Sequence, residues 1–459
     1  MLINKRKINS LFYIFILTHL IIWTLVPTLT NQNLPLDTIE ALAWGSNLDW
    51  GFNKHPPASA FFVEVFFQIF NNNDFAYYLL SQLFIIIAFF AVWKLSCEFF
   101  KNKTYCFLSV LILEGIFFYN YTTPEFNVYI SKILFWSLTV LFAWKTYNEN
   151  DLKNFIILGI ISAIGFLSHY LFIYLLLSID LFFIYIFFIK KERKFNFKYV
   201  VTLVIFLLII LPHLIWLSNN EFVTLTYGIH RTNLENSSIF NHIQYPLTFF
   251  FKQIGILIPF FIILYMTVEK FQFIKFNIKD KKIVFLSFVN FVPLILIFFT
   301  SLILGVKIKT MWMAPFYLFN GLFFIYFFRK QINIKKLKRF YISFMFFFIL
   351  SPIVYLSVSI TQDDKRTDYP GKEIAYLIQT RWDKNFLNDI SIVIGNEWHA
   401  GNLSYHLVSR PIWFNESIPS DFEYSGGVIY IGNKDALKQI CPGIFGSINR
   451  QGICMIGSK

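Results

Sequence analysis

Long apolar runs separated by short polar segments fill the sequence from its start to about residue 360. Runs of about 17 to 25 apolar residues are typical of membrane-spanning helices. Only His169 and Tyr170 separate the fifth and sixth runs, so the pattern leaves open whether that pair forms two full spans. The pattern predicts an α-helical polytopic membrane protein with eleven spans, at 10–29, 76–93, 105–119, 128–144, 155–169, 171–189, 199–217, 249–268, 283–305, 311–328 and 340–360.

After residue 360 the pattern changes to a mixed, turn-rich segment. Short apolar runs at 391–395 and 426–432 are typical of β-strands, and the stretch 399–408 between them is a candidate helix. The sequence therefore predicts a small α/β domain after the spans. We divide the chain into a membrane domain at 1–360, with its first outer loop at 30–75, and an extracytoplasmic domain at 361–459.

Positive charge predicts the orientation, because lysine and arginine are retained on the cytoplasmic side of a membrane. Of the 40 lysines and arginines, 24 fall in the N-terminal segment and every second loop after it, at 94–104, 145–154, 190–198, 269–282 and 329–339. The loops on the other side are nearly bare. We therefore expect the N-terminus in the cytoplasm and the C-terminal domain in the extracytoplasmic space.

Composition changes this interpretation little. Hydrophobic residues make up 56% of the chain and charged residues 15%, which excludes an ordinary soluble domain. The net charge of +13 follows the inner loops rather than one basic face, so we expect no nucleic-acid partner. The first apolar run lacks a small-residue cleavage site and extends to residue 29, which favours an anchor over a signal peptide.

The four cysteines divide by compartment. Cys97 and Cys106 flank an inner loop, whereas Cys441 and Cys454 lie in the outer domain. Only the outer pair meets an oxidising compartment. We therefore predict a disulfide between Cys441 and Cys454.

The most unusual polar segment is part of the first outer loop, where residues 37–57 read DTIEALAWGSNLDWGFNKHPP. Asp37 and Glu40 are three residues apart and so project to one side of a helix. Pro56 and Pro57 force an extended backbone at His55 and end the preceding element. Carboxylates, an imidazole and a cation at one membrane face suit a reaction that deprotonates a hydroxyl and stabilises a departing phosphate.

Structural roles compete with this catalytic interpretation. Asp37 is a preferred first residue of a helix and Glu40 a preferred third, so the two would form a capping arrangement. Lys54 would bind phosphate as a point charge, or would extend to lipid headgroups. We predict that Asp37 is catalytic, and for Glu40 the residues leave catalysis and capping equally open. The amphipathic stretch 58–70 would lie along the outer interface.

The other outer loops add further polar residues. Glu125 lies in the second loop and is the nearest partner for Lys132, two helical turns further on, although that lysine also suits the lipid interface. The loop at 216–231 contains Tyr227 and Arg231, whose planar guanidinium suits a phosphate better than a lysine does. His169 is interpreted as structural. Zinc-ligand spacing and a phosphate-binding glycine loop are both absent from the sequence.

These residues resemble those of a known family, the membrane-embedded GT-C glycosyltransferases related to protein O-mannosyltransferases and to the bacterial lipid A aminoarabinose and galacturonic acid transferases. The resemblance covers most of the chain. Its strongest element is the first-loop pattern Asp37, Glu40-Ala41, Trp44-Gly45, Leu48, Gly51 and His55-Pro56-Pro57. Weaker stretches follow in the family's order at 159–170, 211–231 and 311–321, and the tail from YPGKEIAYLIQTRW to GNEWHAGNLSYHLVSRPIW is similar to the outer domain of some bacterial members.

Members of this family transfer a sugar from a polyprenyl-phosphate carrier to an acceptor at the outer face of the inner membrane, usually with inversion at the anomeric carbon. The resemblance implies that Asp37 activates or orients the acceptor and that Lys54 and Arg231 neutralise the carrier phosphate. Several members hold a divalent metal near the first-loop acid and others do not, which leaves the metal open. The predicted site comprises catalytic Asp37, Glu40 and Glu125 and the donor-phosphate ligands Lys54, His55, Arg231 and Tyr227.

The sequence therefore favours an enzyme whose donor is a polyprenyl-phosphate-linked sugar and whose acceptor is lipid A, core lipopolysaccharide or another surface glycan. Two alternatives remain, a transporter or flippase of a lipid-linked sugar and a transferase with a protein acceptor. Transporters often show paired repeats and broken spans near the midplane. The sequence has no convincing repeat and its charges lie at loop level, which favours the enzyme. A non-catalytic scaffold would explain the hydrophobicity but not the charged first loop.

Overall fold

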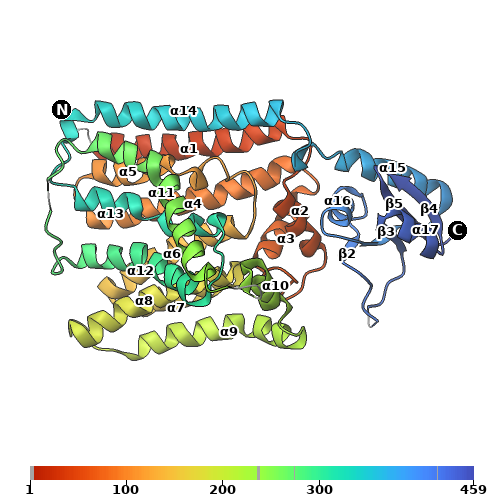
Figure 1. The fold of residues 1–459 in the computed structure, drawn as a ribbon, viewed down its shortest axis with the longest axis horizontal. Coiled ribbons are helices and arrows are strands. Elements are labelled where there is room, and N and C mark those ends of the chain that lie inside the picture. Colours follow the sequence, from red (N-terminus) through yellow and green to blue (C-terminus); the bar gives the residue numbers. More distant parts are fainter. Residues whose placement is uncertain (1–4, 235–237, 273, 421) are drawn as a thin grey trace.

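The computed structural model describes residues 5–234, 238–272, 274–420 and 422–459. Long helices run side by side in one bundle, and the C-terminal domain lies beyond one end of it (Figure 1). Two short helices of the first outer loop, α2 (Leu36–Ser46) and α3 (Ala58–Phe70), lie between the bundle and that domain. The first outer loop therefore lies where the two domains meet.

All eleven predicted spans are largely helical. The remaining helices of the bundle and its loops are α1 (Lys5–Thr30), α4 (Asp74–Phe99), α5 (Lys103–Leu111), η1 (Ile112–Gly115), η2 (Phe117–Tyr119), α6 (Val128–Glu149), α7 (Leu152–Ser168), η3 (Tyr170–Phe172), α8 (Ile173–Ile184), η4 (Tyr185–Ile189), α9 (Phe197–Asn219), α10 (Val223–Thr232), α11 (Asn241–Thr267), α12 (Lys281–Leu304), η6 (Thr310–Tyr317), α13 (Asn320–Phe327), η7 (Ile334–Lys336) and α14 (Lys338–Thr361).

The number of full spans is lower than eleven. Within the described residues, eight helices are long and apolar enough to cross a membrane, or nine if η6 and α13, which are bent by 48°, count as one span. Residues 155–169 correspond to α7, a shorter apolar helix of 17 residues that ends at Ser168, so the 155–189 pair contains one full span. Residues 105–119 are interrupted. The predicted fold class, an α-helical membrane domain with a small C-terminal α/β domain, is confirmed.

The interruption at 105–119 has a packing cause. α5 ends at Leu111, and 3₁₀ turns follow to Tyr119. A Cβ on Gly115 would lie 2.6 Å from the Cα of Phe260, so the backbones of η1 and α11 are in close contact here. All of η1 is buried. Hydrophobic periodicity does not reveal this break, because an unbroken helix and a broken one bury the same apolar residues.

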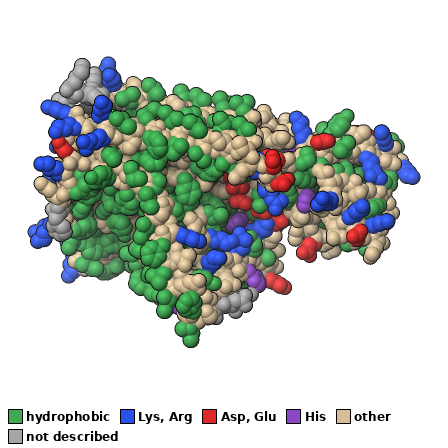
Figure 2. All heavy atoms as spheres, turned by 45° about the horizontal axis from the view of Figure 1, so that its top comes forward, with side chains coloured by type: hydrophobic (Ala, Val, Ile, Leu, Met, Phe, Trp, Pro, Cys, Tyr) green, Lys and Arg blue, Asp and Glu red, His purple; other side chains and the backbone are tan. Residues whose placement is uncertain are grey.

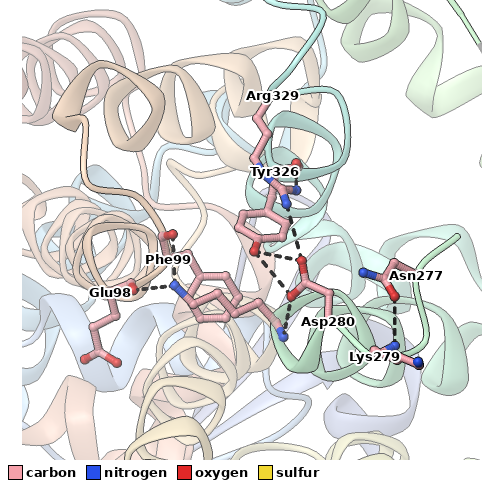
Figure 3. Close-up of polar contacts among 8 residues, drawn as sticks. Glu98, Phe99, Asn277, Lys279, Asp280, Tyr326 and Arg329 are labelled. Carbon is pink, nitrogen blue, oxygen red and sulfur yellow. Dashed lines mark hydrogen bonds and ion pairs between the residues drawn. The ribbon is translucent and has the colours of Figure 1, made fainter. Parts of the chain in front are cut away.

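Lysine and arginine side chains gather at the end of the bundle opposite the C-terminal domain (Figure 2). Polar contacts tie the loops together there (Figure 3). Lys282 Nζ donates to the carbonyl of Phe99 at 2.9 Å, Arg329 Nη2 lies 3.3 Å from Asp280 Oδ2, and the hydroxyl of Tyr326 donates to that oxygen at 3.0 Å. This charge distribution is the one that the positive-inside orientation requires, and the orientation itself stays a prediction.

The C-terminal domain contains a five-stranded sheet in the order β2-β1-β3-β5-β4. β1 pairs in parallel with β2 and β3, and β5 pairs antiparallel with β3 and β4. The strands predicted at 391–395 and 426–432 are β1 and β3, and the candidate helix is α16. Its elements are η8 (Arg366–Asp368), α15 (Gly371–Asn385), β1 (Ile390–Ile394), α16 (His399–His406), β2 (Ile412–Phe414), β3 (Gly427–Asn433), α17 (Lys434–Ile440), β4 (Ile444–Ile448) and β5 (Gln451–Ile456).

A disulfide joins Cys441 to Cys454, the pair expected from the compartment argument, with an S–S distance of 2.00 Å. It links the end of α17 to β5. Cys97 and Cys106 are free thiols at the other end of the molecule.

α16 packs directly on α2 of the first outer loop. A Cβ on Gly401 would lie 3.0 Å from the Cβ of Ala43, so the two helices are in close contact. A buried ion pair strengthens this junction, because Arg410 Nη2 donates to Glu64 Oε2 of α3 at 2.8 Å and to the carbonyl of Leu42 at 2.6 Å. The C-terminal domain is therefore fixed to the helices that carry the predicted site.

Candidate active site

The first turn of α2 presents Asp37 without using it as a cap. Pro35 is the N-cap residue of α2, and its side chain makes no capping hydrogen bond. Proline suits this position because a helix start needs no N–H donor there. The backbone N–H of Asp37 donates to Glu125 Oε1 at 3.0 Å, so a distant carboxylate satisfies a donor that a local cap would otherwise take. The capping alternative for Asp37 and Glu40 is not realised.

The segment between α2 and α3 is held by the helices α9 and α10. His213 Nδ1 lies 2.6 Å from the carbonyl oxygen of Trp50, and Trp216 Nε1 donates to Asp49 Oδ2 at 2.6 Å. Thr224 donates its hydroxyl to the carbonyl of Phe52 at 2.6 Å. The loop that carries Lys54 and His55 is thus fixed by a helix more than 150 residues away in the sequence.

Asp37 and Glu125 form a pair of adjacent acids. Asn127, the N-cap of α6, donates its amide to Asp37 Oδ2 at 3.4 Å. Burial raises the pKa of Asp37, and the positive charges of Lys54 and Arg231 oppose that rise. Burial, assisted by the charge of Asp37, raises the pKa of Glu125 to about 8. At neutral pH the Glu125 carboxyl group is therefore protonated. Asp37 has more positive charge around it than Glu125 has.

Lys54 lies between two carboxylates rather than pointing to lipid. Its Nζ is 2.7 Å from Glu40 Oε1 and 3.1 Å from Glu397 Oε1. Burial lowers the pKa of Lys54, but the charges of Glu40 and Glu397 outweigh it, so the pKa lies above its ordinary value. Lys54 is therefore a positively charged ammonium group at neutral pH. Burial raises the pKa of Glu40 although Lys54 acts against it.

His55 is a neutral imidazole in this site. Burial lowers its pKa to about 3, and the nearby positive charges of Lys54, Lys132 and Arg231 act in the same direction. Its ring packs near the rings of Trp44, His169 and Tyr227, with centroids 5.9, 5.6 and 6.3 Å away. A neutral imidazole binds an anion only through one N–H, so His55 is a weaker phosphate ligand than the charged Lys54 and Arg231.

A second group of cations lies near Tyr227. The Arg231 guanidinium lies 5.8 Å from the Tyr227 ring centroid. The N–H of Lys307 donates to the carbonyl of Thr232 at 2.9 Å, which brings the link before η6 to the end of α10. Burial, with the charges of Arg231 and Lys307, lowers the pKa of Lys309. Arg231, Lys307 and Lys309, here called the basic patch, therefore lie close enough to repel one another and to share an anion.

Lys132 and Glu125 do not pair. The Lys132 side chain is buried inside the bundle, and its Nζ donates to the carbonyl of Trp312 at 3.0 Å and lies 5.5 Å from the Tyr129 ring centroid. Both predicted partners of Lys132, Glu125 and the lipid headgroups, are therefore replaced by a backbone carbonyl of η6. This contact ties α6 to the bent pair of helices.

Glu397 of the C-terminal domain, 3.1 Å from Lys54, was not singled out in the sequence. His169, interpreted there as structural, caps η3 by accepting from the N–H of Leu171 at 3.1 Å, and its ring also lies 5.6 Å from that of His55. His169 stands in a stretch that belongs to the family pattern, and Glu397 stands in the tail stretch GNEWH, so each had only a weak signal. The fold brings both to the first outer loop.

Acidic, basic and histidine side chains gather on the surface between the bundle and the C-terminal domain (Figure 2). Within the described residues, no group of three His, Cys, Asp or Glu side chains is placed to hold a metal ion. A small cavity here is lined by Asp37, Glu40, Ala41, Trp44, His55, Ser59, Asn127 and Val128.

Comparison with known proteins identifies the fold. The family model of dolichyl-phosphate-mannose-protein mannosyltransferases matches residues 54–216. ArnT from Cupriavidus metallidurans bound to undecaprenyl phosphate has a TM-score of 0.66 at 10% identity, and the match covers 97% of this chain and 98% of that one. ArnT from the same organism in the apo state has a TM-score of 0.61 at 10% identity with the same coverage. No curated protein matches the sequence.

The family model begins after Asp37 and Glu40, and the solved structures show the fold that the first-loop resemblance implies. The chain is a multi-pass membrane protein with the GT-C fold of membrane glycosyltransferases, over both the helical bundle and the C-terminal domain.

Proposed function

We propose that the protein is an inverting glycosyltransferase that moves a monosaccharide from a polyprenyl phosphate, such as undecaprenyl phosphate, to a surface acceptor such as lipid A or core lipopolysaccharide. The observation that carries the proposal is the arrangement around Asp37. Glu125 accepts from the backbone N–H of Asp37, Asn127 donates to the Asp37 carboxylate, and the positive charges of Lys54 and Arg231 act on that carboxylate at one end of a GT-C bundle. The similar ArnT structure is described as bound to undecaprenyl phosphate, which supports this class of carrier.

Asp37 is the proposed general base. In the reaction the acceptor hydroxyl gives its proton to the Asp37 carboxylate while its oxygen forms a bond to the anomeric carbon. The bond between that carbon and the carrier phosphate oxygen breaks, and the phosphate leaves with the electron pair. Attack from the face opposite the phosphate inverts the anomeric configuration. A positioned carboxylate base contributes about 10² to 10⁴ in rate.

Cations stabilise the departing phosphate. Arg231 offers a planar pair of N–H donors that matches two phosphate oxygens, and Lys307 and Lys309 add positive charge beside it. Lys54 adds a fixed charge on the side of Asp37. Because these charges are in place before the reaction, they stabilise the negative charge that develops on the phosphate without reorganisation.

The proposed function is tested by analysing the surface glycans. In a strain that lacks the protein, mass spectrometry of lipid A and surface glycans should show the loss of one sugar mass, and the wild-type protein should restore it. Asp37→Asn should accumulate normally in the membrane and restore nothing, whereas Asp363→Asn, at an exposed position of the loop before the C-terminal domain, should restore the sugar fully. Full activity of the Asp37 variant would exclude Asp37 as the base.

Purified protein separates the remaining functions. Transfer from a polyprenyl-phosphate sugar to an added lipid A acceptor in detergent supports the proposal. If the missing sugar is found on a protein instead, the acceptor assignment is wrong, in line with the mannosyltransferase family model. If the protein gives no transfer to any acceptor but the lipid-linked sugar stays on the inner leaflet of the deletion strain, the function is that of a flippase.

A further inference from the structure

A carboxylate from the C-terminal domain reaches into the first outer loop. The Glu397 side chain lies just before α16, and its residue is only 8% exposed. Its Oε1 accepts from Asn53 Nδ2 at 3.1 Å and lies 3.1 Å from Lys54 Nζ. Buried carboxylates are rare unless they are paired, so this contact across the domain boundary needs an explanation.

The position of Glu397 is determined by the packing of its neighbours. The backbone and side chain of Asn396 engage the start of α16, since its Oδ1 accepts from the His399 N–H at 2.8 Å. Trp398 is buried, with its ring centroid 5.2 Å from that of Tyr369. One turn further on, the close contact of Gly401 with α2 sets the distance between the two domains. Glu397 is therefore held rigidly over Lys54.

The contact with Glu397 determines which N–H donor of Lys54 remains for a ligand. An ammonium group has three N–H donors. Glu40 and Glu397 each accept one of them, at 2.7 and 3.1 Å. Two fixed acceptors restrict the rotation of the ammonium and so fix the direction of its third donor. A lysine on a flexible four-carbon stem would otherwise lose this direction to side-chain motion.

We propose that Glu397 is a positioning residue of the active site, through which the C-terminal domain orients Lys54 toward the carrier phosphate. The proposal rests on the proposed function, because it needs a phosphate donor at Lys54. The C-terminal domain thus contributes a residue to the active site. Glu397 acts through Lys54 and touches neither the sugar nor the acceptor.

The first experiment compares Glu397→Gln, Glu397→Asp and the control Glu373→Gln, which removes an exposed carboxylate from α15 of the same domain. Each full-length variant is purified in detergent, and its melting temperature and its kcat and KM for the polyprenyl-phosphate sugar are measured. We expect roughly a tenfold loss of kcat/KM in the Gln variant, partial rescue by the shorter acid and no change in the control. Melting temperatures should stay within the range of the control.

The second experiment asks whether Glu397 acts through Lys54. Binding of undecaprenyl phosphate is measured for Lys54→Met, Glu397→Gln and the double variant. If Glu397 only positions Lys54, the double variant binds as weakly as Lys54→Met alone, because contacting residues are not additive. If the two losses multiply, Glu397 acts independently and the proposal is wrong.

The outcomes distinguish this inference from the function it rests on. Wild-type transfer together with full activity of Glu397→Gln overturns the positioning role and leaves the glycosyltransferase in place. A wild-type protein that neither binds undecaprenyl phosphate nor transfers sugar overturns both. A Glu397→Gln variant that melts far below the control but has wild-type kcat and KM per folded molecule also overturns the positioning role, since the carboxylate is then needed only for folding.

Discussion

Asp37 and Glu125 are adjacent acids, so their protonation states decide which of them acts as the base. The pKa of Glu125 lies at about 8, and burial also raises the pKa of Asp37, although Lys54, the Asn127 amide and Arg231 act against that rise. Glu125 is thus the neutral partner at pH 7. We therefore propose Asp37 as the base and a supporting role for Glu125 that a neutral amide can replace.

We therefore expect Glu125→Gln to keep most of the transfer activity at pH 7, whereas Asp37→Asn loses about 10² to 10⁴ in rate. Wild-type activity should fall as the pH rises through about 8, because an ionised Glu125 adds negative charge that opposes the departing phosphate. The Gln variant should lack this fall. Initial rates from pH 6 to 9.5 check the prediction, and a Gln variant as inactive as Asp37→Asn would make Glu125 a catalytic acid in its own right.

The protonation of His55 makes the stability of the folded protein depend on pH. Its pKa in the folded protein is about 3, well below the ordinary value of 6.5, so the unfolded chain binds the proton more tightly. The neutral ring costs nothing above about pH 6.5, and stability is lost as the pH falls from there toward 3. We expect the melting temperature of His55→Gln to fall less over this interval than that of the wild type. Parallel acid slopes would mean that His55 is charged in the folded protein.

At the scale of helices, close backbone contacts decide which segments pack and which face lipid. A Cβ on Gly321 of α13 would lie 2.1 Å from the carbonyl oxygen of Ser109 in α5, whereas a Cβ on Gly255 of α11 would meet nothing within 4 Å. Gly255 lies in the interior of α11 and Gly321 in the first turn of α13, so alanine gains at most about 1 kcal/mol of helix propensity at either position. A larger difference between the two variants therefore reports the effect of packing.

We expect Gly321→Ala to destabilise the protein by about 1–3 kcal/mol, since the helices must move apart or bend to admit the methyl group. Gly255→Ala should be neutral or slightly stabilising. Melting temperatures in the same detergent check the difference. Equal melting temperatures for the two variants would show that α5 and α13 are not in contact.

The sequence predicts where the helices lie better than it predicts where they are broken or bent. All eleven apolar runs are largely helical because burial in protein and burial in lipid both require apolar side chains. The break at η1 and the bend before α13 escape this reasoning, since they depend on contacts such as that between Gly115 and Phe260. Strands β2, β4 and β5 were also missed. They are short or interrupted by polar residues, and neighbouring strands stabilise them more than their own pattern does.

The site shows the same limit at the scale of the whole molecule. Asp37, Glu40 and Lys54 lie in one loop, so their proximity could be predicted from the sequence. Glu397 was not predictable, because 344 residues separate it from its partner Asn53 and only the docking of α16 on α2 brings them together. An acid in a turn-rich tail has no local feature that marks it. Residues contributed by a second domain become visible only in the fold.

The orientation of the molecule in the membrane is the remaining expectation, and it decides which substrates reach the site. The basic end of the bundle and the active site lie at opposite ends (Figure 2). If the basic end faces the cytoplasm, the site faces the periplasm, where lipid-linked sugars and lipopolysaccharide meet. Single cysteines at two exposed positions, Val408 in the C-terminal domain and Lys194 in the loop at 190–198, report on this directly.

We expect Val408→Cys to react with a membrane-impermeant maleimide in intact spheroplasts, because position 408 lies in the C-terminal domain and the valine there is 90% exposed. Lys194→Cys should react only after the membrane is permeabilised. Both variants are made in a Cys97→Ser background, since Cys97 is a half-buried free thiol at the basic end. The reverse labelling pattern would place the site in the cytoplasm, where a periplasmic acceptor has no access, and the proposed function would then be wrong.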